Sequence, residues 1–162
     1  MRKMKRREFM AGSAATAAVA GACACGLGGC ATFTGVGKTP AIPAGSYMIE
    51  RGKVKIVLDK APELAKAGGS VKIDDPNLPE PLIVAHAPDG SYVAVGLKCT
   101  HRGVELEYQP KANIFRCASL GRSAFRPAGT RIKGPAKKPL KSCDARLALL
   151  DKNKLVIQLP GG

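Results

Sequence analysis

The chain has 162 residues, enough for one domain of about 110 to 130 residues with extensions. It contains 19 Gly, 12 Pro and no Trp, and only 4% of its residues are aromatic. This composition disfavours long helices and favours short strands around a core of Val, Ile, Leu and Ala. The formal net charge is +14, yet few aromatic side chains accompany the charge, which argues against single-stranded nucleic acid as the partner.

The first 29 residues are expected to be a targeting segment separate from the fold. Residues 6–10 resemble the twin-arginine export motif, and an Ala- and Gly-rich stretch follows them. That stretch is near the length of a membrane span but only weakly hydrophobic, which favours a signal over an uncleaved anchor. Residues 27–30 resemble a bacterial lipobox, in which Cys30 is lipidated after cleavage; cleavage after residues 20–22 is the alternative. Each interpretation places the domain on the periplasmic side of the cytoplasmic membrane.

Residues 30–46 are rich in Gly, Pro and Thr and are expected to form a flexible tether to the membrane. The domain is expected to occupy residues 47–162. Residues 61–67 are expected to make one helical turn. Alternating or β-branched segments predict short strands at residues 47–50, 53–58, 70–73, 82–86, 91–95, 113–116, 146–150 and 155–159. The predicted fold class is therefore all-β, built of short antiparallel strands.

One predicted hairpin leads directly to the most informative motif. Residues 82–86 and 91–95 flank Asp89-Gly90, a pair that supplies the positive φ angles of a tight turn. The second strand of this hairpin runs into Cys99-Thr100-His101, and the strand predicted at residues 113–116 delivers Cys117. Two thiolates and an imidazole brought together by two loops have the ligand chemistry of a metal site.

The order of these residues resembles the Rieske 2Fe–2S domain over about residues 47–160. The first ligand loop of that family matches residues 99–103, and its second loop matches Cys117 with Gly121 and residues 123–125. Residues 134–136, with Leu140 after them, resemble the proline-bearing loop that covers the cluster. The resemblance implies an all-β Rieske-type domain with two ligand loops at one tip.

The second loop departs from the family pattern. Leu120 stands where the family has its second histidine, and Arg122 is inserted after Gly121. Cytochrome bc-type members carry a disulfide between the two loops, but its positions are Val104 and Ser119 here. In lacking that disulfide the chain resembles the dioxygenase ferredoxin type.

The resemblance implies that Cys99 and Cys117 bind the inner iron and that His101 binds the outer iron. Three alternatives remain for the site. A 2Fe–2S cluster forms with water, Cys143 or another group as the fourth ligand; zinc binds the three residues and water; or no metal binds and Cys99 and Cys117 form a disulfide. Cys143 also has a plainer interpretation as a buried free thiol, and His86 is expected to be a half-exposed strand residue.

Basic residues cluster around this motif. Between residues 98 and 141 there are eleven Lys and Arg but only two acidic residues, Glu105 and Glu107, a net charge of +9. The basic residues are Lys98, Arg102, Lys111, Arg116, Arg122, Arg126, Arg131, Lys133, Lys137, Lys138 and Lys141. The segment is either a solvated face or a docking surface for an acidic redox protein. Anionic lipid headgroups are a further possible contact.

These patterns predict an exported, membrane-tethered Rieske-type electron-transfer protein, or such a subunit of a larger oxidoreductase complex. The alternative is a cluster-free Rieske-fold binding or structural subunit, with a Cys99–Cys117 disulfide and a basic docking face. No nucleophile paired with a base is apparent in the sequence, so no catalytic residues are predicted and an enzymatic role is left open.

Overall fold

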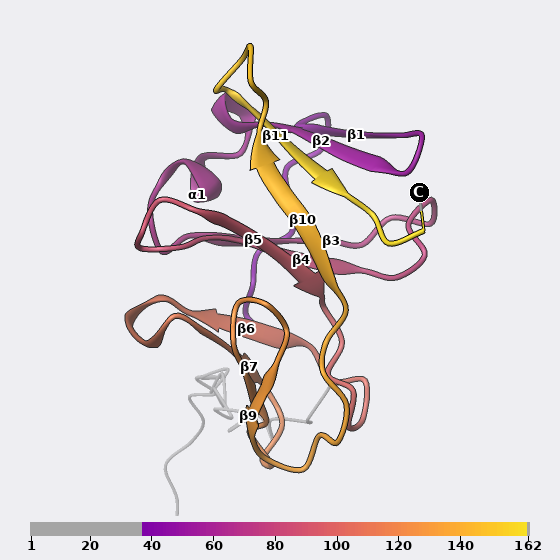
Figure 1. Ribbon diagram of the computed structural model, residues 1–162, viewed down its shortest axis with the longest axis vertical. Coiled ribbons are helices and arrows are strands. Elements are labelled where there is room, and N and C mark those ends of the chain that lie inside the picture. The colour runs from indigo at the N-terminus through magenta and orange to yellow at the C-terminus, as the bar shows by residue number, and fades with distance from the viewer. Residues whose placement is uncertain (1–36, 162) are drawn as a thin grey trace, which may run out of the picture. The chain divides into compact units, whose positions relative to one another are not determined.

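The computed structural model describes residues 37–161. The expected targeting segment and Cys30 lie outside the described residues. The described chain is nearly all-β, which confirms the predicted fold class (Figure 1). Its strands are β1 (Tyr47–Glu50), β2 (Lys53–Val57), β3 (Ser70–Ile73), β4 (Leu82–His86), β5 (Tyr92–Gly96), β6 (Leu106–Gln109), β7 (Ile114–Cys117), β8 (Ala124–Phe125), β9 (Arg131–Lys133), β10 (Ser142–Leu147) and β11 (Lys154–Gln158). The helical elements are the short helix α1 (Pro62–Ala65) and two 3-10 turns, η1 (Leu58–Lys60) and η2 (Pro110–Ala112).

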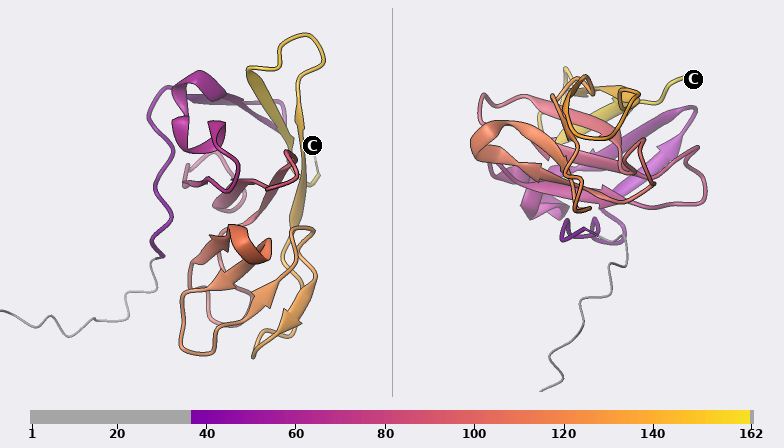
Figure 2. Two further views of the ribbon diagram at one scale, coloured as in Figure 1. Left: turned by 90° about the vertical axis from the view of Figure 1, so that its left-hand side faces the viewer. Right: turned by 90° about the horizontal axis from the view of Figure 1, so that it is seen from below.

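The strands form two antiparallel sheets. The large sheet has the order β1-β2-β11-β10-β5-β4-β3, and the small sheet has the order β6-β7-β8-β9. In the left view of Figure 2 the small sheet, in orange, lies below the large sheet. The ligand motifs belong to the loops around the small sheet.

Strand β4 contacts two separate hydrophobic clusters because it is apolar on both faces. Val84 packs into a cluster formed mainly by the large sheet, which we call the large-sheet cluster. Ile83 and Ala85 point the other way, into a cluster shared with the small sheet, which we call the site cluster. This arrangement explains the continuous apolar run of residues 82–85, since a strand covered on both faces does not alternate. The site cluster also contains Cys99 and Cys117.

The hairpin predicted before the first ligand loop is confirmed. Strands β4 and β5 pair antiparallel from Leu82 opposite Gly96 to His86 opposite Tyr92. Gly90 in the turn has a φ angle of 86°, which a side-chain-bearing residue adopts only with strain. The first ligand loop therefore starts from a well-paired strand.

Other predicted boundaries are corrected. The strand predicted at residues 146–150 is β10, which begins at Ser142 and ends at Leu147. It begins earlier because Ser142 and Cys143 pair with β5 before the strand pairs with β11. Strands β6, β8 and β9 were not predicted, since they are short and depend on pairing within the small sheet.

Part of the expected tether belongs to the domain. The backbone N–H groups of Gly37 and Lys38 donate hydrogen bonds to the carboxylates of Glu105 and Glu107, each at 2.8 Å. Further along, Ile42 is buried and its N–H donates to Lys72. Residues 37–42 therefore contact the domain in the structure, because backbone N–H groups among them find acceptors on both sheets. Within residues 37–161, no helix is long and apolar enough to cross a membrane.

Candidate metal centre

A tight turn presents Cys99. The N–H of Cys99 donates to the carbonyl of Val104 at 2.8 Å, and the N–H of Gly103 donates back to the carbonyl of Cys99 at 2.9 Å. Gly103 has a φ angle of 68°, so a glycine suits the turn. The turn is anchored to β5 on one side and, through a bridge between Lys98 and Glu105, to the start of β6 on the other.

A second turn presents Cys117 beside the first. Strands β6 and β7 place Leu106 opposite Cys117, and the N–H of Ala118 donates to the carbonyl of Glu105. The N–H of Arg122 donates to the carbonyl of Ser119 at 3.0 Å, which closes a turn over residues 119–122. Pairing in the small sheet thus brings the two cysteine loops together, as the sequence predicted.

The two thiols are buried next to each other. Cys99 is 2% exposed and Cys117 is 3% exposed, and both are free cysteines in the structure. Burial raises the pKa of the Cys99 thiol, and the neighbouring Cys117 raises it further. Hydrogen bonds from the backbone N–H of His101 and the hydroxyl of Ser123 act in the opposite direction on that pKa. Two buried cysteines next to each other supply the sulfur ligands that an iron–sulfur or zinc site uses, so this pair fits a metal centre.

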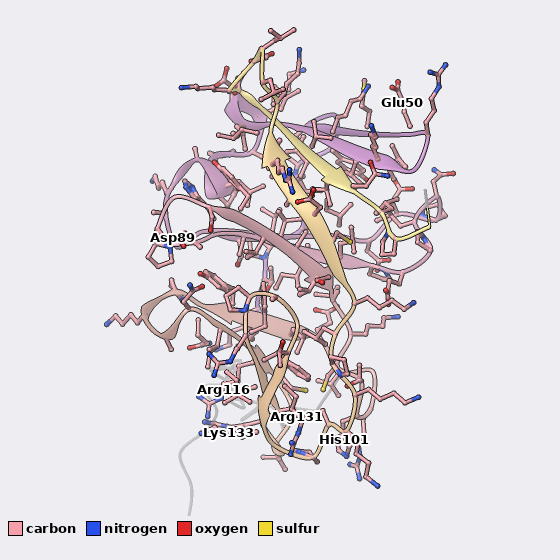
Figure 3. All side chains as sticks on the ribbon, in the orientation of Figure 1. Glu50, Asp89, His101, Arg116, Arg131 and Lys133 are labelled. Carbon is pink, nitrogen blue, oxygen red and sulfur yellow. The ribbon has the colours of Figure 1, made fainter. Side chains whose placement is uncertain are left out.

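His101 offers a nitrogen without a partner. Its Nδ1 atom is buried and has no hydrogen bond in the structure, and Figure 3 shows the side chain at the small-sheet end of the domain. A buried polar atom without a partner costs free energy unless a ligand or metal satisfies it. However, among the described residues no group of three or more His, Cys, Asp and Glu side chains is arranged to hold a metal ion. The structure thus brings Cys99 and Cys117 together but does not bring His101 into one group with them.

Ser123 was not predicted as a site residue, although it connects the site to the proline-bearing loop at residues 134–140, which we call the third loop. It is fully buried, and its hydroxyl oxygen accepts a hydrogen bond from the N–H of Ala136 at 3.1 Å. The same hydroxyl interacts with the Cys99 thiol and lowers its pKa. The third loop is also attached at Thr100, whose hydroxyl donates to the carbonyl of Lys138 at 2.7 Å. The available signal in the sequence was the position of Ser123 within the family-like residues 123–125.

The remaining predicted residues lie in different surroundings. Leu120 is 84% exposed at the turn after Cys117, and its side chain has no atom that can bind a metal. Cys143 on β10 packs against the large-sheet cluster, whereas Cys99 and Cys117 belong to the site cluster. Burial, together with Glu80, raises the pKa of Cys143 to about 11. His86 is half-buried as expected, with its ring stacked on Tyr92 at 4.4 Å.

The fold and the paired cysteine loops define a class of iron–sulfur domain, and the family comparison agrees. The model of the Rieske [2Fe-2S] domain family matches residues 55–144, more than half of the chain. The chain therefore belongs to the Rieske [2Fe-2S] domain family, whose members are iron–sulfur electron-transfer proteins and generally bind a 2Fe–2S cluster.

Two curated relatives are similar in sequence. The chain is 28% identical over 146 residues to the cytochrome b6-f complex iron-sulfur subunit 3 of Nostoc sp. PCC 7120, a match that covers 74% of this chain and 78% of the relative. It is 42% identical over 50 residues, 31% of its length, to the Bacillus subtilis protein YhfW, which is named as a Rieske 2Fe-2S iron-sulfur protein. The match spans only 10% of that relative.

Two solved structures are similar to part of this chain. The plasma membrane Rieske protein of Synechocystis PCC 6803 matches 55% of this chain and 85% of its own, with 23% identity and a TM-score of 0.45. The ferredoxin of Sphingomonas yanoikuyae B1 matches 60% of this chain and 94% of its own, with 20% identity and a TM-score of 0.49.

Proposed function

We propose that this chain is an exported, membrane-tethered Rieske-type electron-transfer protein, or such a subunit of a larger oxidoreductase, in which Cys99, Cys117 and His101 hold the cluster. The observation that carries the proposal is the pair of buried, adjacent thiols with the unpartnered Nδ1 atom of His101 nearby in sequence. When bound, a 2Fe–2S cluster supplies one-electron transfer. The protein's contribution is to bury the thiols and to donate hydrogen bonds toward Cys99 from His101 and Ser123.

The ligand set we propose is incomplete on its histidine side. Leu120 occupies the position of the second histidine in the family pattern, and it points to solvent. A fourth ligand would then be water or another side chain. Cys143 is the weaker candidate for this role, since it packs against the large-sheet cluster. An outer iron with an exchangeable ligand makes the cluster more labile than one with two histidines.

Membrane attachment and a protein partner complete the proposal. The twin-arginine-like residues 6–10, the lipobox-like residues ending at Cys30 and the segment after it support export to the periplasmic side and tethering. The similarity to a cytochrome b6-f complex subunit supports a place in a larger oxidoreductase. The excess of Lys and Arg between residues 98 and 141 favours an acidic redox protein as the docking partner.

A cluster-free binding subunit is the second candidate. It is favoured by the absence, within residues 37–161, of a side-chain group arranged to hold a metal ion. In that case Cys99 and Cys117, which are adjacent and free in the structure, would form a disulfide in an oxidising compartment.

Metal analysis separates the two candidates. The full chain is produced with its native export signal, and iron, acid-labile sulfide, zinc and free thiols are measured with the visible spectrum. If the chain is an electron-transfer protein, iron and sulfide should be present in about equal amounts, near two of each per chain. Colourless, metal-free protein with no free thiol at Cys99 or Cys117 would establish the second candidate instead, and zinc with these two thiols protected would contradict both.

Replacing Leu120 with His tests the incomplete ligand set. The variant restores an imidazole at the position of the second family ligand, so the iron content of the purified protein and its resistance to chelators should rise. Leu120→Gln is the matched control, since it introduces polarity without an imidazole. Equal iron contents in the wild type and both variants would mean that the loop geometry does not admit a histidine ligand.

A further inference from the structure

A small pocket lies on the outer side of the small sheet, next to Cys117. It has a volume of about 210 Å³, and its lining includes Arg116, Arg122, Gln109 and Glu107, together with Cys117 and Ala118. Two guanidinium groups in one small pocket form a concentrated source of hydrogen-bond donors and positive charge. Apart from Cys117, the residues that line this pocket have no role in the proposed metal centre.

Arg116, which lines this pocket, carries an unpartnered donor. The Nε atom of Arg116 is buried and makes no hydrogen bond in the structure. Arg116 lies opposite Glu107 in the register of β6 and β7, yet no ion pair forms between these two side chains in the described part of the chain. Glu107 instead accepts a hydrogen bond from the backbone N–H of Lys38. A buried N–H without an acceptor is costly, which indicates that an acceptor from outside the domain completes this site.

Arg122 reaches the pocket from a strained backbone position. Its φ angle is 44°, in the left-handed region where Gly or Asn is cheaper. Residues held in such conformations occur frequently at functional sites, where the surrounding structure maintains them. The turn that holds Arg122 is closed by its hydrogen bond to Ser119, so the turn keeps Arg122 at the pocket beside Cys117.

The geometry points to a carboxylate-binding pocket, in which Arg116 and Arg122 receive an acidic side chain of the protein that docks at the small-sheet end. This inference deepens the proposed docking of an acidic redox partner and rests on it. A carboxylate has two oxygens and no donor, so it matches the planar fork of a guanidinium, including its Nε–H group. Because Cys117 lines the same pocket, the bound carboxylate would place the partner directly against one of the proposed cluster ligands.

The surrounding charge supports a protein carboxylate as the ligand. Exposed cations on the same end, including Lys111, Arg126 and Lys133, form no ion pairs within residues 37–161. Figure 3 shows Arg116, Arg131 and Lys133 together at this end of the domain. Such a field steers an acidic surface toward the pocket, and the pocket then selects one carboxylate.

Binding of a fluorescein-labelled hexaglutamate peptide to the full chain, followed by fluorescence anisotropy, tests the pocket. Arg116→Gln and Arg122→Gln should each weaken binding about tenfold, the loss expected when a charge-assisted hydrogen bond is removed. Lys152→Gln removes the same charge at the far end of the β10–β11 hairpin and should change binding by no more than about twofold. If all three variants lose peptide affinity equally, the peptide is bound by general charge attraction, and the proposed pocket is wrong.

Two further variants separate geometry from charge and from folding. Arg116→Lys keeps the charge but removes the planar fork and its Nε–H donor, so it should bind more weakly than the wild type although less weakly than Arg116→Gln; binding at the wild-type level would overturn the proposal. Arg122→Gly suits the positive φ angle, so its melting temperature should equal or exceed that of the wild type while peptide binding is lost. Retained binding in this well-folded variant would also overturn it.

Iron and sulfide are measured on the same preparations. If an arginine variant keeps wild-type levels of iron and sulfide but no longer binds the peptide, the loss of binding is due to the pocket and not to loss of the cluster. Protein that lacks iron but binds the peptide through Arg116 and Arg122 would contradict the proposed electron-transfer function. It would still support the carboxylate-binding pocket.

Discussion

The large and small sheets differ in how their charges are arranged. Of the five ion pairs between described side chains, four lie on the large sheet or its adjoining loops, and the fifth, Lys72 with Glu105, joins the two sheets. In contrast, none of the basic residues from 98 to 138 forms an ion pair with a described residue. The large sheet has the balanced surface of a scaffold, whereas the small sheet keeps its positive charge available at the end that carries the cysteines.

The two sheets bury their apolar side chains in different clusters. In the large sheet, β2 and β11 alternate between buried and partly exposed residues, as strands with one covered face do. Strands β6 and β7 of the small sheet alternate in the same way, but the cluster that they face also contains the two buried thiols. The site is therefore built into the apolar cluster of the small sheet.

Replacing one cysteine in each cluster should give the largest difference between the regions. Cys117→Ser in the site cluster removes a proposed metal ligand, so iron and acid-labile sulfide should fall to background. Cys143→Ser on β10 should leave both unchanged. The check is metal analysis of the purified full chains. Loss of iron in both variants would place Cys143 in the site and end the functional separation of the two clusters.

Two isoleucines give the next largest contrast. Ile56 on β2 is fully buried, whereas Ile132 on β9 is 42% exposed. Ile56→Ala should lower the free energy of unfolding by about 2–5 kcal/mol because it leaves a cavity. Ile132→Ala should lower it by less than about 1 kcal/mol, since partly exposed side chains lose little. Urea denaturation followed by circular dichroism measures both, and equal losses would mean that burial of the isoleucine side chain does not set its contribution to stability.

Ser123 tests how firmly the third loop is attached to the site. Ser123→Ala leaves the buried N–H of Ala136 without its acceptor and should cost about 1–3 kcal/mol of the free energy of unfolding. Ser142→Ala, at an exposed position on β10, is the control and should change it by less than about 0.5 kcal/mol. The measurement is again denaturant unfolding; an unchanged midpoint for Ser123→Ala would mean that the loop is held by other contacts.

The smallest expected effect is a pH dependence in the large-sheet half. The N–H of Asn77 and then the Tyr47 hydroxyl stabilise the Asp75 carboxylate, so they lower its pKa below the ordinary value of 3.8. A lowered folded-state pKa contributes stability above the unfolded pKa, and this contribution disappears as the pH falls through the folded pKa. The wild type should therefore be slightly more stable than Asp75→Asn at about pH 7, and the difference should vanish at about pH 2. A difference that grows on acidification would contradict this sign.

Individual elements show where prediction from the sequence succeeds. The hairpin of β4 and β5 was predictable because Asp89-Gly90 imposes a local turn geometry. The first ligand loop was predictable because Cys99, His101 and Gly103 lie within five residues. Strand β6 was missed because its extended form depends on pairing with β7, and β10 was misplaced because its first residues pair with β5. The packing of residues 37–46 was missed because Gly- and Pro-rich composition does not show that Glu105 and Glu107 will accept their N–H groups.

Local turns, strand alternation and motif spacing were enough to predict the fold class and the family. Which groups meet depends on the tertiary structure. It placed Cys99 and Cys117 in one buried cluster and Cys143 in another, left Leu120 in solvent, and put Arg116 and Arg122 around one pocket. The physical reason is that burial and hydrogen-bond partners arise from contacts between strands distant in sequence, which no local pattern encodes.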